Sequence, residues 1–260
     1  MPSISDASSG PGYPRAATID DFVRNIASVR ARIAAAAERS GRDTSDIRLL
    51  PVSKTVGEDR IRLAVQAGCR ELGENKVQEA KRKQGNLADL DVRWSVIGHL
   101  QTNKARDVAA FAAEFQALDS LRVAEVLDRR LQGVGRYLDV YVQVNTSAEE
   151  SKYGLEPADV PAFLAALPRY TALRVRGFMT LALFTADTPR VRECFRLLRT
   201  LRDRARDADP ALIGPGELSM GMSGDYEVAI EEGADCVRVG QAIFGARATA
   251  NDHYWPTSTE

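Results

Sequence analysis

A lysine directly follows an apolar run near the start of this sequence. The run covers residues 47–52 and is typical of a short buried strand, and Ser53 and Lys54 come after it. A lysine that is partly removed from water has a lowered pKa, and its neutral amine can form a Schiff base with an aldehyde. The simpler interpretation is a surface lysine at the end of a strand. Both interpretations place Lys54 where a strand meets a loop.

A second stretch that could do chemistry is the glycine-rich segment 219–225, Ser-Met-Gly-Met-Ser-Gly-Asp. It joins a predicted strand to the start of a predicted helix. Gly221 and Gly224 permit a tight turn and a close approach to a ligand, and free N–H groups at a helix start favour an anion. Ser223 adds a hydroxyl donor. An ordinary serine or aspartate helix cap is the simpler interpretation of the same residues.

Gly240 and Gln241 follow the next predicted strand, again at a predicted helix start. Arg238 faces the same side of that strand as Gly240, because side chains alternate along a strand. An arginine in an apolar strand must be paired or must face a ligand, and a structural ion pair with Glu217 or another carboxylate would also account for it. Two loops of this kind in succession favour a phosphate site.

Short apolar strands alternate with amphipathic helices along the whole chain. The predicted strands cover residues 47–53, 69–72, 93–97, 115–118, 140–144, 173–179, 217–220 and 236–239. The predicted helices that follow them cover 58–67, 76–84, 103–113, 121–132, 157–167, 189–208 and 226–232, with a last one starting near 242. Another helix, from Thr18 to before Gly41, precedes the first strand. This alternation predicts a parallel sheet that is buried on both faces.

Eight strand–helix units in about 210 residues fit a single-domain α/β protein, a closed TIM (β/α)8 barrel. An open doubly wound sheet is the alternative, because sequence does not give the strand order. Active sites of TIM barrels lie at the C-terminal ends of the strands, and phosphate often binds in the last two loops. The residues that follow the predicted strands are polar or glycine: Lys54, Asn75, His99, Asp119, Ser120, Asn145, Thr180, Ser223, Gly240 and Gln241.

Composition narrows the possible classes of function. The chain has 260 residues, of which 44% are apolar and 27% are charged, and its net charge is -1. A net charge near zero gives no overall attraction to nucleic acid or to a membrane surface, so a nucleic-acid partner is not expected. No run approaches the roughly 20 apolar residues of a membrane span, so a membrane partner is not expected. The basic stretches 76–83 and 190–206 could favour a nucleic-acid binder, but they interleave acidic residues or lie on an outer helix face, so solvated helix faces are the better interpretation.

The ends of the chain and its cysteines complete this description. We predict a disordered tail at 1–17, the barrel at 18–248 and a C-terminal tail at 249–260, with no signal peptide. The three cysteines, Cys69, Cys194 and Cys236, are too widely spaced for a metal or redox motif. Reduced, buried thiols in a cytoplasmic protein are expected, and no metal site is predicted.

Taken together, these stretches resemble the pyridoxal phosphate homeostasis proteins, the YggS/PROSC family. The resemblance is carried by residues 51–54, 72–79, 94–104, 144–145, 152–154, 176–180, 218–223 and 237–245. The matching stretches occur in the family's order from the first predicted helix to about Arg247. Each stretch is a modest signal, and the whole set is highly specific.

The resemblance implies a barrel of the alanine-racemase N-terminal-domain type that binds pyridoxal 5'-phosphate. Lys54 would hold the cofactor aldehyde as a Schiff base. The resemblance assigns phosphate contacts to Ser223, Gly224, Gly240 and Gln241, the pyridine nitrogen to Arg238, and the pocket wall to Asn75 and His99. The phosphate-binding loops and the lysine are those that the residues themselves indicate.

This sequence departs from the family pattern at two places. Many relatives have lysine and proline two and three places after the reactive lysine, where this chain has Val56 and Gly57. A second cofactor-accepting lysine at that place is therefore not expected, whereas another such as Lys152 is left open. Gln241 replaces the more usual threonine or serine, so a side-chain hydroxyl contact to phosphate is lost while the backbone contact can persist.

The expected function is cofactor binding and delivery, with no catalytic residues. Arginine stays protonated, so Arg238 would leave the pyridine nitrogen unprotonated and the ring a weak electron sink. The racemising relatives also have a second domain, for which we expect no room after the last strand. His99, Tyr153 and Tyr226 could act as acid or base but are better interpreted as pocket walls or loop residues. We expect a monomer whose partners are the cofactor and apo-enzymes that use it. The alternative function is that of a pyridoxal phosphate-dependent amino-acid racemase.

Overall fold

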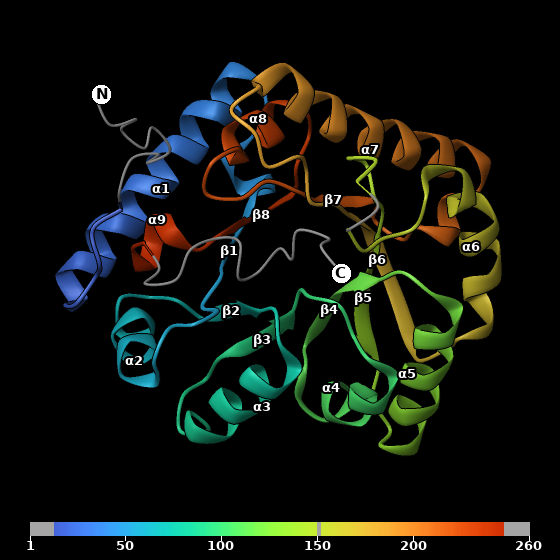
Figure 1. Cartoon of the computed structure of the whole chain (residues 1–260), viewed down its shortest axis with the longest axis horizontal. Coiled ribbons are helices and arrows are strands. Elements are labelled where there is room, and N and C mark those ends of the chain that lie inside the picture. Colours follow the sequence, from blue (N-terminus) through green and yellow to red (C-terminus); the bar gives the residue numbers. More distant parts are fainter. Residues whose placement is uncertain (1–12, 150–151, 247–260) are drawn as a thin grey trace, which may run out of the picture.

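Eight strands surround a common axis, and helices cover their outer side (Figure 1). The computed structural model describes residues 13–149 and 152–246. The strands are β1 Arg48–Pro51, β2 Glu71–Glu74, β3 Arg93–Val96, β4 Glu114–Leu118, β5 Leu138–Gln143, β6 Leu173–Met179, β7 Glu217–Ser219 and β8 Cys236–Val239. The α-helices are α1 Ile19–Arg39, α2 Glu58–Gln66, α3 Val77–Asn86, α4 Ala105–Phe111, α5 Leu121–Gly133, α6 Val160–Ala166, α7 Thr188–Ala208, α8 Tyr226–Glu231 and α9 Gln241–Phe244.

The strand order decides between the two predicted architectures. The sheet runs β1-β8-β7-β6-β5-β4-β3-β2, so each strand pairs with its neighbours in sequence and β1 also pairs with β8 in parallel. The sheet closes between β1 and β2 through a parallel bridge of Val52 with Gly73, where the Ser53 N–H donates to the Gly73 carbonyl at 3.0 Å. The predicted TIM barrel is confirmed, and the open doubly wound sheet is not formed.

The first helix, α1, forms outside the strand–helix alternation and covers the last two helices. Thr18 caps it, and Asp21 completes a reciprocal capping box at its first turn. Its buried face includes Phe22, Val29 and Ile33, and the ring of Phe22 meets Phe244 of α9 edge-on at 5.5 Å. α1 therefore joins the start of the barrel to its end.

The boundary of the barrel lies earlier than the sequence predicts. Ala16 is buried and its N–H donates to the Phe244 carbonyl at 3.4 Å, while the Ala246 N–H donates to the Tyr13 carbonyl at 2.9 Å. Residues 13–17 thus pack on α9, although the predicted tail covered 1–17. The rest of that tail, and the predicted C-terminal tail 249–260, lie outside the described residues.

All eight strands in the described residues agree with the prediction to within two residues at each end. β2 is the one strand among them with both ends displaced by two residues: it covers Glu71–Glu74, because Gly73 and Glu74 pair with Ser95 and Val96 of β3. The apolar pattern alone favours 69–72. The predicted helix 157–167 is an α-helix between two 3-10 turns, Pro157–Asp159 and Leu167–Arg169, each of which begins with a proline near its first position.

Candidate functional site

Lys54 and Gly240 leave two paired strands at the same end of the barrel. The Val52 N–H donates to the Val239 carbonyl at 2.9 Å, so the ends of β1 and β8 lie side by side. A Cβ on Gly240 would lie 3.2 Å from the Val52 carbonyl oxygen, a distance at which neighbouring atoms must give way. Lys54 is half-buried two residues beyond Val52. The predicted lysine and the predicted phosphate loop are therefore neighbours.

The Ser223 hydroxyl connects the loop after β7 to the turn after β8. Its oxygen accepts the N–H of Gly240 at 3.2 Å and the N–H of Ala242 at 3.5 Å. A hydroxyl has one proton to donate, and among the described residues Ser223 Oγ serves only as an acceptor. The hydroxyl proton can therefore bind an acceptor group from a ligand. A phosphate fits this donor.

The helices after these two loops are short. α8 has 6 residues and α9 has 4. A helix macrodipole needs several aligned peptide units, so the helix-end attraction expected from the sequence contributes little here. The direct donors that remain to hold an anion are the Ser223 hydroxyl and the backbone N–H groups of Gly224 and Gln241, since the Gly240 N–H already donates to Ser223 Oγ.

Arg238 lies inside the barrel, 3% exposed, without a carboxylate partner in direct contact among the described residues. Its Nη1 donates to Ser219 Oγ at 2.7 Å and its Nη2 donates to the Thr180 carbonyl at 2.7 Å. Burial lowers the pKa of Arg238, but a guanidinium stays protonated in proteins. The alternative ion pair with Glu217 is wrong: Glu217 pairs with Arg176 instead.

Asn75 and His99 also lie at the C-terminal ends of their strands, as predicted. Asn75 follows β2, and a Cβ on Gly98 would lie 2.3 Å from the Asn75 carbonyl oxygen, so only glycine permits this approach. The His99 ring stacks on the Tyr153 ring at 3.9 Å between centroids and 11° between planes. Its Nδ1 lies 3.7 Å from Asp119 Oδ2. Burial raises the pKa of Asp119, against the opposing effect of His99.

Tyr226 lies in a different environment from His99 and Tyr153. It is fully buried, and the Arg32 guanidinium of α1 lies 5.1 Å from the centre of its ring. Burial raises the pKa of Tyr226 to about 12. Its side chain thus packs against α1 in the helix layer, which removes Tyr226 from the acid–base candidates.

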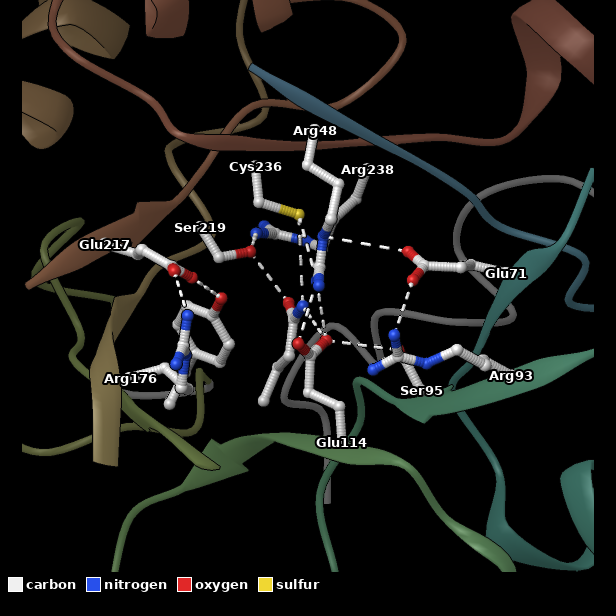
Figure 2. A network of polar contacts seen from close by, with 12 residues as sticks. Arg48, Glu71, Arg93, Ser95, Glu114, Arg176, Glu217, Ser219, Cys236 and Arg238 are labelled. Carbon is white, nitrogen blue, oxygen red and sulfur yellow. Dashed lines mark hydrogen bonds and ion pairs between the residues drawn. The ribbon is translucent and has the colours of Figure 1, made fainter. Parts of the chain in front are cut away.

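A chain of polar side chains fills the barrel interior below Arg238, and the sequence interpretation missed it (Figure 2). Ser219 Oγ donates to Gln116 Oε1 at 2.7 Å, and Gln116 Nε2 donates to Glu114 Oε1 at 2.6 Å. Arg48 Nη2 donates to both Glu114 oxygens at 2.8 Å. The chain connects the buried guanidinium of Arg238 to the buried carboxylate of Glu114 through two neutral groups.

The remaining predictions concern cysteines, metals and membranes. Cys69, Cys194 and Cys236 are free and buried, as expected, and burial raises the pKa of the Cys69 thiol to about 11. Within residues 13–149 and 152–246, no three histidine, cysteine, aspartate or glutamate side chains gather as metal ligands would. In the same ranges, no helix has the length and apolar character needed to cross a membrane.

The fold and a match to a family model show the broad class of protein to which this chain belongs. Residues 25–248 match the family model described as alanine racemase, N-terminal domain. The solved alanine racemase of Streptomyces lavendulae is similar in fold, with a TM-score of 0.67 at 18% identity. That match covers 89% of this chain and 58% of the racemase chain. The chain is a barrel of this class.

Closer relatives give the particular family. A protein of Pseudomonas aeruginosa named pyridoxal phosphate homeostasis protein is 43% identical over 87% of this chain and 96% of its own length. The structure of PipY from Synechococcus elongatus, described with PLP bound, is 34% identical with a TM-score of 0.77, and covers 86% of this chain and 100% of that chain. This chain belongs to the pyridoxal phosphate homeostasis protein family.

Proposed function

We propose that this protein binds pyridoxal 5'-phosphate as a Schiff base with Lys54 and takes part in the intracellular supply of that cofactor. The observation that carries the proposal is the adjacency of Lys54 and the Ser223–Gly240 contact at the paired ends of β1 and β8. An amine and a phosphate-binding loop on neighbouring strands suit a ligand with both an aldehyde and a phosphate. The names of the family's members support the same ligand.

Each residue at the strand ends has a proposed part in holding the cofactor. Lys54 supplies the amine, which condenses with the aldehyde and releases water. The Ser223 hydroxyl and the N–H groups of Gly224 and Gln241 donate to the phosphate, and Gly240, whose own N–H donates to Ser223 Oγ, lets the phosphate approach the backbone closely. Arg238 donates to the pyridine nitrogen, while Asn75 and His99 line the pocket. The bound cofactor supplies a reactive aldehyde, which the protein holds for release.

Binding without strong catalysis is the second part of the proposal. Arg238 is held by Ser219 and Thr180 as a fixed hydrogen-bond donor. Beside such a donor the pyridine nitrogen stays unprotonated, so the ring withdraws electrons from a bound amino acid only weakly. We also propose that the protein acts in the cytoplasm as a monomer and that apo-enzymes receive the cofactor from it.

Proton exchange tests this proposal against the alternative, an amino-acid racemase. L-Alanine is incubated with the cofactor-loaded protein in deuterated water, with the Lys54→Ala variant as control. We expect α-proton exchange no faster than with the free cofactor. Lys54-dependent exchange or inversion near the roughly 1–1000 per second of ordinary enzymes would favour the racemase. A transfer assay should then show cofactor passing from the loaded protein to an apo-enzyme.

A further inference from the structure

Lys83 of α3 is a fully buried lysine beside the turn that carries Lys54. Its Nζ donates to the Ser53 carbonyl at 2.7 Å and to Glu74 Oε1 at 2.7 Å. It also pairs with Glu79 Oε1 at 2.7 Å. Three acceptor oxygens therefore surround the three protons of this ammonium group, two of them in hydrogen bonds and one in an ion pair. The side chain is thus held in one position between α3 and the residues at the ends of β1 and β2.

The same group of side chains holds the backbone on both sides of Lys54. Before it, the Ser53 carbonyl accepts Lys83 Nζ, and Ser53 Oγ donates to Glu74 Oε1 at 2.6 Å. After it, the Thr55 N–H donates to Glu79 Oε1 at 2.8 Å. Ser53 Oγ thus points toward Glu74 and Lys83, and Lys54 lies in the turn that follows Ser53.

Thr55 adopts a backbone conformation that needs such support. Its φ is 66°, in the left-handed region that β-branched residues rarely occupy. Residues persist in this region only where the surrounding structure holds them there. Here the Val56 N–H donates to the Ser53 carbonyl at 3.0 Å to close the turn, and Glu79 holds the Thr55 N–H. The turn that presents Lys54 is therefore fixed at several points.

The buried ion pair of Lys83 and Glu74 is not expected to be present for stability alone. Removing an ion pair from water is costly, and apolar side chains of similar volume often stabilise a core better. Glu74 is 0% exposed, and its Oε2 has no hydrogen-bond partner among the described residues. The charged side chains form hydrogen bonds with main-chain polar atoms, which an apolar side chain cannot do. Those atoms belong to the residues that flank Lys54.

We propose that Lys83, together with Glu74 and Glu79, positions the Lys54 amine for reaction with the cofactor aldehyde. This inference rests on the proposed function, since it assumes that Lys54 forms the Schiff base. A cofactor held by its phosphate beside Gly240 places its aldehyde at a fixed point. Lys54, in the turn after β1, must reach that point, and the contacts of Lys83, Glu74 and Glu79 fix the position of this turn.

The test compares two ligands in matched variants. Lys83→Met combined with Glu74→Gln removes both buried charges and nearly preserves volume, and Glu79→Ala releases the Thr55 N–H in a second variant at a partly exposed side chain. Lys81→Met is the control, because Lys81 lies on the same helix but pairs with Asp107 at the surface. The ligands are pyridoxal 5'-phosphate and pyridoxamine 5'-phosphate, which has no aldehyde and so cannot bond to Lys54.

We expect the double variant to form the borohydride-trappable Lys54 adduct at least about tenfold more slowly, since small misplacements of reacting groups can cost up to about 100-fold. Glu79→Ala should show a smaller loss. Pyridoxamine 5'-phosphate affinity should stay within about twofold of wild type. If the wild type labels at Lys54 and the double variant forms the adduct at the same rate, the positioning role is wrong. An equal loss for both ligands in the double variant would also overturn the positioning role alone. A wild type that gives no Lys54 adduct would instead refute the proposed function.

Discussion

At the scale of single residues, the Ser223 hydroxyl is the clearest donor for a phosphate. It accepts two backbone N–H groups, and its own proton is available. Ser223→Ala should weaken binding of pyridoxal 5'-phosphate by about 1.5–3 kcal/mol, the range for a hydrogen bond to a charged group. Isothermal titration would measure this, with Ser45→Ala, in the 3-10 turn before β1, as control. Equal affinity of the wild type for pyridoxal and its phosphate would show that the phosphate site is misplaced.

Gly240 should be more sensitive than Ser223 because its surroundings leave no room for a side chain. A Cβ there would lie 3.2 Å from the Val52 carbonyl oxygen, whereas nothing lies within 4 Å of one on Gly85. Gly240→Val should therefore lower cofactor affinity further than Ser223→Ala, and Gly85→Val should leave it unchanged. Thermal unfolding of both variants would separate lost binding from lost folding. A Gly240→Val protein that is folded and binds normally would contradict the proposed close approach of the phosphate to the backbone at Gly240.

The strand-end residues could be predicted from sequence, whereas the residues that support them could not. Lys54 and Ser223 each follow an apolar run, and that junction is visible in the sequence. Lys83 looks like one of several lysines on an exposed helix, because its burial depends on the packing of α3 against β2. The interior chain through Glu114 and Gln116 had a weak signal: polar residues two apart in a strand share one face. The apolar Phe115 between them and the apolar residues after them hid that pattern.

At the scale of elements, the start of α1 makes one contribution to stability that depends on pH. The backbone N–H of Ala17 and the hydroxyl and N–H of Thr18 lower the pKa of Asp21 to about 2. An unfolded aspartate titrates near about 3.9. Because the folded pKa is the lower one, the stabilisation is complete above the unfolded value and is lost as pH falls from about 4 to about 2.

The Asp21→Asn variant should accordingly have a lower Tm than wild type at neutral pH. The difference should shrink as the pH is lowered below about 4, where wild-type Asp21 gains its proton. Scanning calorimetry at a series of pH values would follow it. Asp20→Asn removes a charge from the same first turn and serves as the control. A difference that grows toward low pH would contradict the assigned sign.

Element types were predictable because their periods are distinct, but some ends were not. The alternation of apolar runs and helical stripes identified every strand and the helices between them. The shift of β2 arose because hydrogen bonds to β3, rather than apolar residues, set its ends at Glu71 and Glu74. In the same way, Gly98 appears ordinary in the sequence, although its closeness to Asn75 admits no other residue.

At the scale of the whole molecule, barrel closure brings the site together. β1 and β8 are far apart in sequence, and their pairing places Lys54 beside Gly240. Sequence alone could not provide that pairing, because an open sheet would use the same strands in another order. The closed topology therefore sets the position of Lys54 relative to the loop at Gly240. Without that closeness, the two loops would not form one site for a cofactor.

The most direct test of this account is to find which lysine carries the cofactor. The purified protein is loaded with pyridoxal 5'-phosphate, reduced with borohydride, digested and mapped by mass spectrometry. We predict one dominant adduct, on Lys54, and its loss in the Lys54→Ala variant. Lys152, whose Nζ donates to the Ala182 carbonyl at 2.9 Å, is the competing lysine on the loop after β5. A main adduct on Lys152, or on any lysine other than Lys54, would contradict the account.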